Sequence, residues 1–123
     1  MDNFIKNVIG GGLHNYSTQE HIVGKWIDGS DIYEKSLVTT LSSNTKDEEL
    51  LNVDNLKFVI SFNATIKRST GYGTMLNYYV SSSNNDNFYW YKNGIFVNSA
   101  AGGTLYCTCT YIKNWYLPYY LYF

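Results

Sequence analysis

The sequence has very little proline and almost no excess charge. Its 123 residues include a single proline, Pro118, and the formal net charge is -1. Nucleic-acid-binding domains usually carry a basic patch, so this balance argues against a nucleic-acid partner. No stretch approaches the roughly 18 consecutive apolar residues that span a bilayer, so we expect no membrane span. Residues 1–13 also lack the pattern of a secretory signal peptide.

Cysteine is equally scarce, since Cys107 and Cys109 are the only two. They stand two positions apart in a predicted strand, where alternate side chains share a face, and a disulfide between them would be strained. No further histidine or cysteine stands nearby to complete a zinc site. We therefore predict two small buried side chains, and neither a metal nor another cofactor.

Signatures of catalysis are missing too. No glycine-rich loop is followed by the lysine that a phosphate-binding loop requires. His14 and His21 lie near each other in the sequence without a serine or cysteine nucleophile elbow. Pairs of carboxylates can cleave glycans, and the candidates in principle are Asp28, Asp31, Glu34 and Asp86. Asp28 is better explained by a turn. Because no catalytic signature is found, we predict no catalytic residues and no enzymatic activity.

Aromatic residues are abundant, with 13 Tyr, six Phe and three Trp, and aromatic side chains favour strands. Apolar and polar residues alternate from Leu56 to Ile66. Asn93-Gly94 between two apolar runs is a strong hairpin signal. A last core strand is predicted from Leu105 to Ile112. The expected fold is all-β, a compact antiparallel β-sandwich.

The segments between these strands predict further structure. Residues 36–41 and 75–82 are expected to form strands. Residues 42–55 are polar and acidic, which predicts a solvated loop containing at most one helical turn at 47–49. Residues 67–74 contain two glycines and are predicted to form a second loop.

The stretch from Tyr16 to Lys35 predicts a hairpin. Asp28-Gly29 is a turn signal between two apolar runs, because glycine tolerates positive φ and aspartate bonds its own backbone. The favoured interpretation places Trp26 in the core, and the alternative gives it a ligand-binding role.

The same stretch resembles a segment of phage and prophage tail-fibre and baseplate-type proteins of Gram-positive-infecting phages. The shared pattern is Y-S-T-x-E-x-x-V-G-x-W-I-D-G, and here it begins at Tyr16. In those proteins the segment opens a small β-rich C-terminal head domain. The resemblance implies a homotrimer that contacts other virion proteins, is made in the bacterial host cytoplasm and resides on the virion.

The predicted organisation has three parts. Residues 1–15 are expected to form an attachment segment or short stem, with a frayed terminus as the alternative. Residues 16–113 are expected to form the head domain. Residues 114–123 add an aromatic tail that the resembling domains lack.

Two aromatic clusters are candidate contact surfaces. Stacking rings with planar amides suit a bacterial cell-wall saccharide, and the predicted ligand-binding residues are Tyr78, Asn85, Asp86, Tyr89 and Tyr91. The alternative buries both faces of this region, one in the sandwich and one between subunits. The tail is predicted to contact a neighbouring subunit or partner protein through Trp115, Tyr116, Leu117, Tyr119, Tyr120, Tyr122 and Phe123.

The resulting functional prediction is a virion appendage module that contributes to host-surface recognition. The first rival is a purely structural adaptor or decoration protein that forms trimers. The second is a glycan-cleaving depolymerase. Glycan binding separates the first two, and product release from wall material identifies the third.

Overall fold

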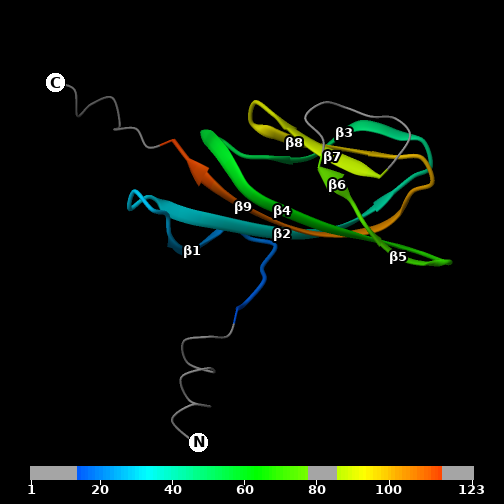
Figure 1. Cartoon of the computed structure of the whole chain (residues 1–123), viewed down its shortest axis with the longest axis horizontal. Helices are drawn as coiled ribbons and strands as arrows, with labels where there is room; N and C mark the ends of the chain where they lie inside the picture. Colours follow the sequence, from blue (N-terminus) through cyan, green and yellow to red (C-terminus); the bar gives the residue numbers. More distant parts are fainter. Residues whose placement is uncertain (1–13, 78–85, 115–123) are drawn as a thin grey trace, which may run out of the picture.

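Alternating apolar and polar residues form strands that belong to two sheets (Figure 1). A computed structural model describes residues 14–77 and 86–114. The strands are β1 His21–Lys25, β2 Asp31–Leu41, β3 Thr45–Asn52, β4 Leu56–Arg68, β5 Gly71–Thr74, β6 Leu76–Asn77, β7 Asn87–Tyr91, β8 Gly94–Ser99 and β9 Gly103–Lys113. The described residues contain no helix, which confirms the predicted all-β class and leaves none that could cross a bilayer.

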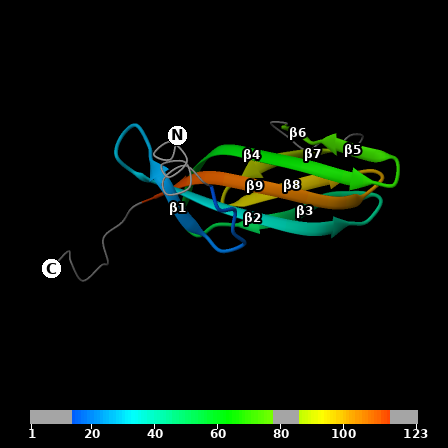
Figure 2. The ribbon, with the colours of Figure 1, turned by 90° about the horizontal axis from the view of Figure 1, so that it is seen from below.

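The strands are ordered β1-β2-β9-β4-β5 in the five-stranded sheet and β3-β8-β7-β6 in the four-stranded sheet. Pairing is antiparallel except between β6 and β7. The two sheets lie in separate layers, with the five-stranded sheet nearer the viewer in Figure 2.

A shared apolar core joins the two layers. The rings of Phe62 on β4 and Phe88 on β7 lie 4.3 Å apart between their centroids, across the interface of the sheets. Ile66, Val97 and Leu105 are fully buried in the same cluster. Burial of these side chains from both layers is what holds the sandwich-like arrangement together.

The central strand β9 confirms the predicted alternation. Its inward side chains, all buried, are Leu105, Cys107, Cys109 and Tyr111. Both cysteines are free thiols, as predicted, and burial raises the pKa of each to about 12. They therefore remain protonated at neutral pH and act as small apolar side chains.

The loop predicted at residues 42–55 is wrong, because β3 occupies most of it. This strand pairs with β8, and its Leu51 contributes to the core. β3 is an edge strand, so its acidic residues 47–49 remain exposed while the backbone pairs. The long-range pairing with β8 outweighed the local polarity that predicted a loop.

The second predicted loop, residues 67–74, is also wrong. β4 continues to Arg68 and forms a hairpin with β5. Gly71 has a φ of 139°, a conformation that the tight reversal requires and that glycine adopts readily. Of the strand predicted at 75–82, the structure describes the short β6, and residues 78–85 lie outside the described part.

The β7–β8 hairpin is confirmed, with its turn one residue earlier than predicted. Tyr91 pairs with Gly94, so Lys92 and Asn93 form the connection. Lys92 takes the positive φ of 53°. Gly94 is required by packing, because a methyl group there would lie 2.7 Å from Glu49 Oε2 and 2.8 Å from the Phe96 ring.

The β1–β2 hairpin is confirmed, but the core placement of Trp26 is wrong. The Gly29 amide donates to the Trp26 carbonyl at 2.9 Å, and Gly29 has a φ of 89°. The Trp26 ring is half-buried and meets the Phe58 ring edge-on at 5.7 Å between centroids, outside the core cluster. The hairpin extends past the end of the core, so its tryptophan packs on the rim.

Candidate functional site

The outer face of the five-stranded sheet is covered with hydroxyl groups. The inward residues of β9 are apolar, so its alternating residues Thr108 and Thr110 point outward. The Thr108 hydroxyl pairs with that of Ser36 on β2 at 2.8 Å, and the Thr110 hydroxyl pairs with that of Ser61 on β4 at 2.6 Å. These pairs tie three neighbouring strands together and give the face a polar, uncharged floor.

A groove of about 640 Å³ lies over this floor. Its lining residues are Tyr16, Ser17, Thr18, Glu34, Ser36, Leu37, Val38, Ser61, Asn63, Thr65, Tyr106, Cys107, Thr108 and Thr110. The volume falls in the range of small-molecule sites, roughly 300–1,000 Å³. Tyr106 and Tyr16, which are 42% and 68% exposed, add aromatic rings to the polar floor.

One side of the groove is formed by the segment that precedes β1. We call residues 14–20 the N-terminal strap; it is the dark blue segment that crosses the outer face in Figure 2. The strap is attached to the edge of β2, where the Ser36 amide donates to the Ser17 carbonyl at 2.8 Å. The Gln19 amide donates to the Ser17 hydroxyl oxygen at 3.0 Å, which fixes the local turn.

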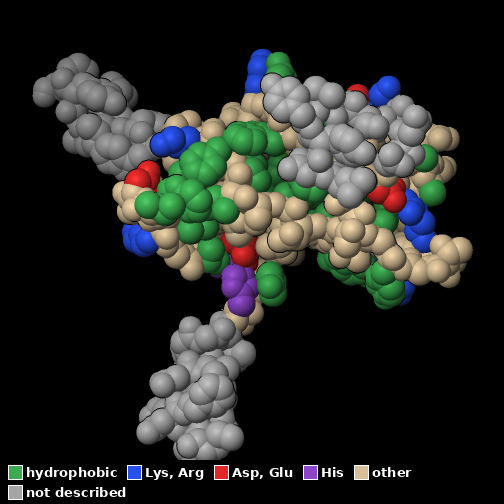
Figure 3. Space-filling view, in the orientation of Figure 1, with side chains coloured by type: hydrophobic (Ala, Val, Ile, Leu, Met, Phe, Trp, Pro, Cys, Tyr) green, Lys and Arg blue, Asp and Glu red, His purple; other side chains and the backbone are tan. Residues whose placement is uncertain are grey.

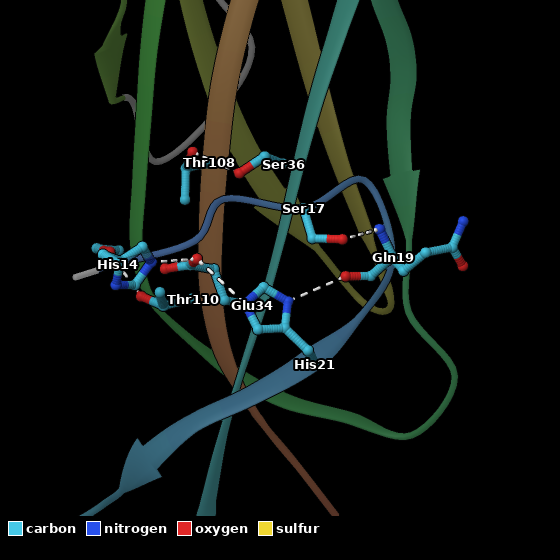
Figure 4. A network of polar contacts seen from close by, with 9 residues as sticks. His14, Ser17, Gln19, His21, Glu34, Ser36, Thr108 and Thr110 are labelled. Carbon is cyan, nitrogen blue, oxygen red and sulfur yellow. Dashed lines mark hydrogen bonds and ion pairs between the residues drawn. The ribbon is translucent and has the colours of Figure 1, made fainter. Parts of the chain in front are cut away.

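A buried carboxylate, Glu34, lies beneath the strap (Figure 4). The side chain of Glu34 is 4% exposed, and its Oε1 accepts a hydrogen bond from His14 Nε2 at 2.5 Å. Nε2 of His21 lies 3.7 Å from the same oxygen. In Figure 3 a purple patch of histidine lies on the underside, next to a red carboxylate. The first residue of the strap and the residue directly after the strap therefore both approach one buried carboxylate.

The orientation of the His21 ring is set by a hydrogen bond at Nδ1, the nitrogen that faces away from Glu34. Its Nδ1 lies 3.1 Å from the Gln19 carbonyl, which can only accept, so Nδ1 carries the proton. This bond aims the Nε2 edge of the imidazole toward Glu34. A hydrogen bond to one ring nitrogen is the usual way in which a protein fixes the role of the other.

The opposite side of the strap is held by Glu20. It accepts hydrogen bonds from the buried Tyr111 hydroxyl and, at 3.0 Å, from Lys113 Nζ. Burial alone would raise the pKa of Glu20, but these two hydrogen bonds outweigh it and hold the pKa below its usual value. Burial, reinforced by Glu20, raises the pKa of Tyr111. The strap thus has ionic or charge-assisted contacts on both faces of the sheet.

Of the residues predicted to bind ligand, the structure describes Asp86, Tyr89 and Tyr91, and none of these three lines the groove. Asp86 accepts from Arg68 Nη2 at 2.6 Å and from the Ser99 hydroxyl at 2.7 Å. Burial would raise the pKa of Asp86, but the hydrogen bonds from Arg68 and Ser99 together with the charge of Arg68 outweigh it and lower the pKa. Arg68 Nε also donates to the Gly102 carbonyl at 2.6 Å, so this cluster ties β4 to the β8–β9 connection.

Tyr89 and Tyr91 lie on the outer face of the four-stranded sheet. The Tyr89 ring stacks on Phe96 at 5.3 Å between centroids, and its hydroxyl donates to Asp47 at 2.8 Å. Burial and the Asp47 carboxylate raise the pKa of Tyr89 to about 12. Tyr91 is exposed, with Lys92 Nζ 5.4 Å from its ring centroid. These two rings form an aromatic surface on the opposite side of the molecule from the groove.

The other predicted positions are distributed as follows. Tyr78 and Asn85 lie outside the described residues, as do the seven predicted interface residues of the tail. Tyr72, a further exposed ring, lies on β5 of the five-stranded sheet.

The groove was missed in the sequence because it is assembled from strands far apart in the chain. Ser36 and Thr108 are 72 positions apart. One local signal existed, since Thr108 and Thr110 alternate with Cys107 and Cys109 in the predicted strand. Short hydroxyl side chains at the outward positions of a central strand indicate a face that is not covered by a second apolar layer.

The four acidic residues considered for glycan cleavage each have a partner. The Ser30 amide donates to Asp28 at 2.9 Å, Asp31 pairs with Lys25, and the partners of Glu34 and Asp86 are given above. Among residues 14–77 and 86–114, no group of three histidine, cysteine or acidic side chains is arranged to hold a metal ion.

The arrangement of the groove is suited to recognising a ligand by hydrogen bonding and stacking. Its hydroxyls both donate and accept, and its two tyrosine rings offer flat apolar surfaces. Comparisons of the chain with protein-family models, with curated proteins and with solved structures give no match.

Proposed function

We propose that this protein is a saccharide-binding module of a phage tail-fibre or baseplate-like appendage and contributes to recognition of the host surface. The observation that carries the binding proposal is the groove on the outer face of the five-stranded sheet. Its volume, hydroxyl floor and aromatic rings are all properties of sites that bind sugars. The bacterial cell-wall saccharide is the ligand class that fits a virion appendage.

The chemistry of the lining supports a sugar ligand. Ser36, Ser61, Thr108 and Thr110 offer hydroxyls in a plane, and Asn63 adds an amide. Glu34 is the one charged residue of the lining, and its carboxylate is covered by His14. A ligand in the groove therefore meets polar but uncharged groups, which exchange hydrogen bonds with sugar hydroxyls without the cost of desolvating an ion.

The appendage part of the proposal rests on the sequence resemblance that begins at Tyr16. The resembling segment comprises most of the strap and the β1–β2 hairpin, so it contributes one side of the groove. A compact antiparallel sandwich assembled as a homotrimer is the architecture that the resemblance implies. We include that architecture and residence on the virion in the proposal.

Binding to an array of bacterial wall saccharides, with paired tyrosine variants, tests the proposal. Tyr106→Ala removes a ring from the groove, and Tyr91→Ala removes an exposed ring from the opposite sheet as a matched control. We expect Tyr106→Ala to weaken binding about tenfold or more, as for other aromatic anchors. Tyr91→Ala is expected to leave it unchanged.

The reverse pattern would place the ligand on the aromatic surface of Tyr89 and Tyr91. If the wild-type protein binds no wall saccharide, the recognition function is wrong.

A second candidate, a structural adaptor, is favoured by the β1–β2 hairpin. Its exposed apolar side chains are Ile22, Val23 and Ile27, the last of which is 92% exposed. Exposed apolar residues on an edge strand are a common site of subunit contact. Light scattering of the wild-type chain and of Ile27→Asp tests this candidate, which predicts an oligomer that the substitution dissociates. A wild-type monomer at micromolar concentration would contradict it.

A further inference from the structure

We propose that Glu34 is a positioning residue that seats the N-terminal strap against the five-stranded sheet and thereby shapes the groove. The relevance to ligand binding rests on the proposed function, but the seating itself does not. Glu34 does not contact the ligand in this proposal, because its side chain is 4% exposed beneath the strap. It acts through the histidines that bracket the groove wall.

The geometry places both ends of the groove wall under the control of one carboxylate. His14 at the start of the strap donates to Glu34 Oε1 at 2.5 Å, and His21 directly after the strap lies 3.7 Å from the same atom. Between these histidines, Tyr16, Ser17 and Thr18 line the groove. If the His14 contact is lost, the start of the wall is held over β2 by the Ser36–Ser17 backbone bond alone.

The energetics make the seating depend on the charge of Glu34. A buried carboxylate needs hydrogen-bonded partners, and its charge-assisted bonds are roughly twice as strong as neutral ones. The described hydrogen-bond partner of Glu34 is His14, at the start of the strap. His21 Nε2, 3.7 Å from the same oxygen, adds an ionic contact when its imidazole is protonated. When the strap is seated, it satisfies the carboxylate; when it lifts, water replaces the histidines.

A consequence is that ligand binding and strap seating are linked. A ligand that contacts Tyr16 or Thr18 binds the seated strap more tightly than the lifted one, so it stabilises the seated position. Residues 1–13 join the strap directly at His14.

Amide hydrogen exchange tests the seating without any ligand. The Ser36 amide donates to the Ser17 carbonyl at 2.8 Å, so its exchange rate reports whether the strap is seated. Glu34→Gln preserves the shape of the side chain and removes its charge. We expect the Ser36 amide to exchange about tenfold faster in this variant, because a charge-assisted bond becomes a neutral one. Core amides of β9 should keep their wild-type rates.

The matched control is Glu48→Gln on β3, which removes an exposed carboxylate from the other sheet and should leave Ser36 unchanged. His14→Gln is a second variant that cannot disrupt the core, since His14 lies on the surface, and it should accelerate Ser36 exchange as Glu34→Gln does. An unchanged Ser36 rate in both strap variants would overturn the proposal. An equal increase at Ser36 and in the β9 core would also overturn it, because Glu34 would then support the whole fold. None of these results depends on glycan binding.

Discussion

The outer faces of the two sheets carry different chemistry. The five-stranded sheet presents paired hydroxyls under a strap, whereas the four-stranded sheet presents stacked rings beside the carboxylates of β3. On the first face, strand partners are distant in the sequence, and small side chains leave a hollow above them. On the second, Tyr89 and Phe96 belong to one hairpin, and their rings fill the space above the backbone. Among the described residues, small side chains therefore leave room for the groove on the first face, whereas stacked rings occupy the space on the second.

The two faces are outer faces of one structure only if the sheets share a core, and Phe62→Ala tests this with the largest expected effect. Its ring packs against Phe88 of the other sheet, so its loss should reduce the free energy of unfolding by about 3–5 kcal/mol. Phe96→Ala, a half-buried ring of the outer face, is the control and should cost about 1–2 kcal/mol. Urea denaturation measures both. Equal costs for the two variants would contradict a shared core.

A pair of glycines probes how tightly each face is packed. At Gly94 a methyl group meets Glu49 and Phe96 within 3 Å, whereas at Gly24 of β1 nothing lies within 4 Å. Gly94→Ala should therefore destabilise the fold by about 1–3 kcal/mol through overpacking. Gly24→Ala should change stability by about 0.5 kcal/mol or less. Thermal unfolding of the two variants measures the difference, and a neutral Gly94→Ala would show that the four-stranded face is open rather than filled.

The smallest expected effect concerns the Tyr89 hydroxyl. Tyr89→Phe removes its bond to Asp47 and should cost about 0.5–1.5 kcal/mol. The pKa of Tyr89 is raised to about 12 from an ordinary value near 10. A raised folded-state pKa gives stability that is complete below pH ~10 and is lost as the pH rises through about 12. Ultraviolet titration of tyrosinate in wild type, Tyr89→Phe and Asp47→Asn measures the pKa of Tyr89. A Tyr89 that titrates near pH ~10 would show that its hydroxyl does not contact Asp47.

Much of the fold could be predicted from local pattern. Alternation located β4 and β9, and the two turn signals located both hairpins, because these features depend on residues that are neighbours in the sequence. Strand β3 was missed, since its pairing with β8 is long-range and its edge position tolerates Asp47 to Glu49. Trp26 was misplaced because a period-two pattern gives the face of a strand but not the end of the core.

The candidate site was less predictable than the fold. Single residues such as His14, His21 and Glu34 were noticed in the sequence, but nothing in it showed that they converge. Their meeting depends on the path of the strap across β2, which in turn depends on the Ser36–Ser17 backbone bond and on Glu20. The sequence spacing of these three residues therefore does not predict that they meet in the folded protein.

The position of β9 has a consequence for how the chain folds. This strand lies between β2 and β4, and both of these neighbours are synthesised well before it. Until β9 arrives, each of them has an unpaired edge, and the five-stranded sheet cannot form. Closing the sheet requires contacts between residues about 70 positions apart, which is a topology of high contact order. Such topologies fold slowly, and their intermediates expose hydrophobic surface and unpaired strand edges. Productive folding of this protein therefore depends on the interval before β9 is inserted, when a chaperone or a low concentration of nascent chains would prevent β2 and β4 from pairing with another molecule.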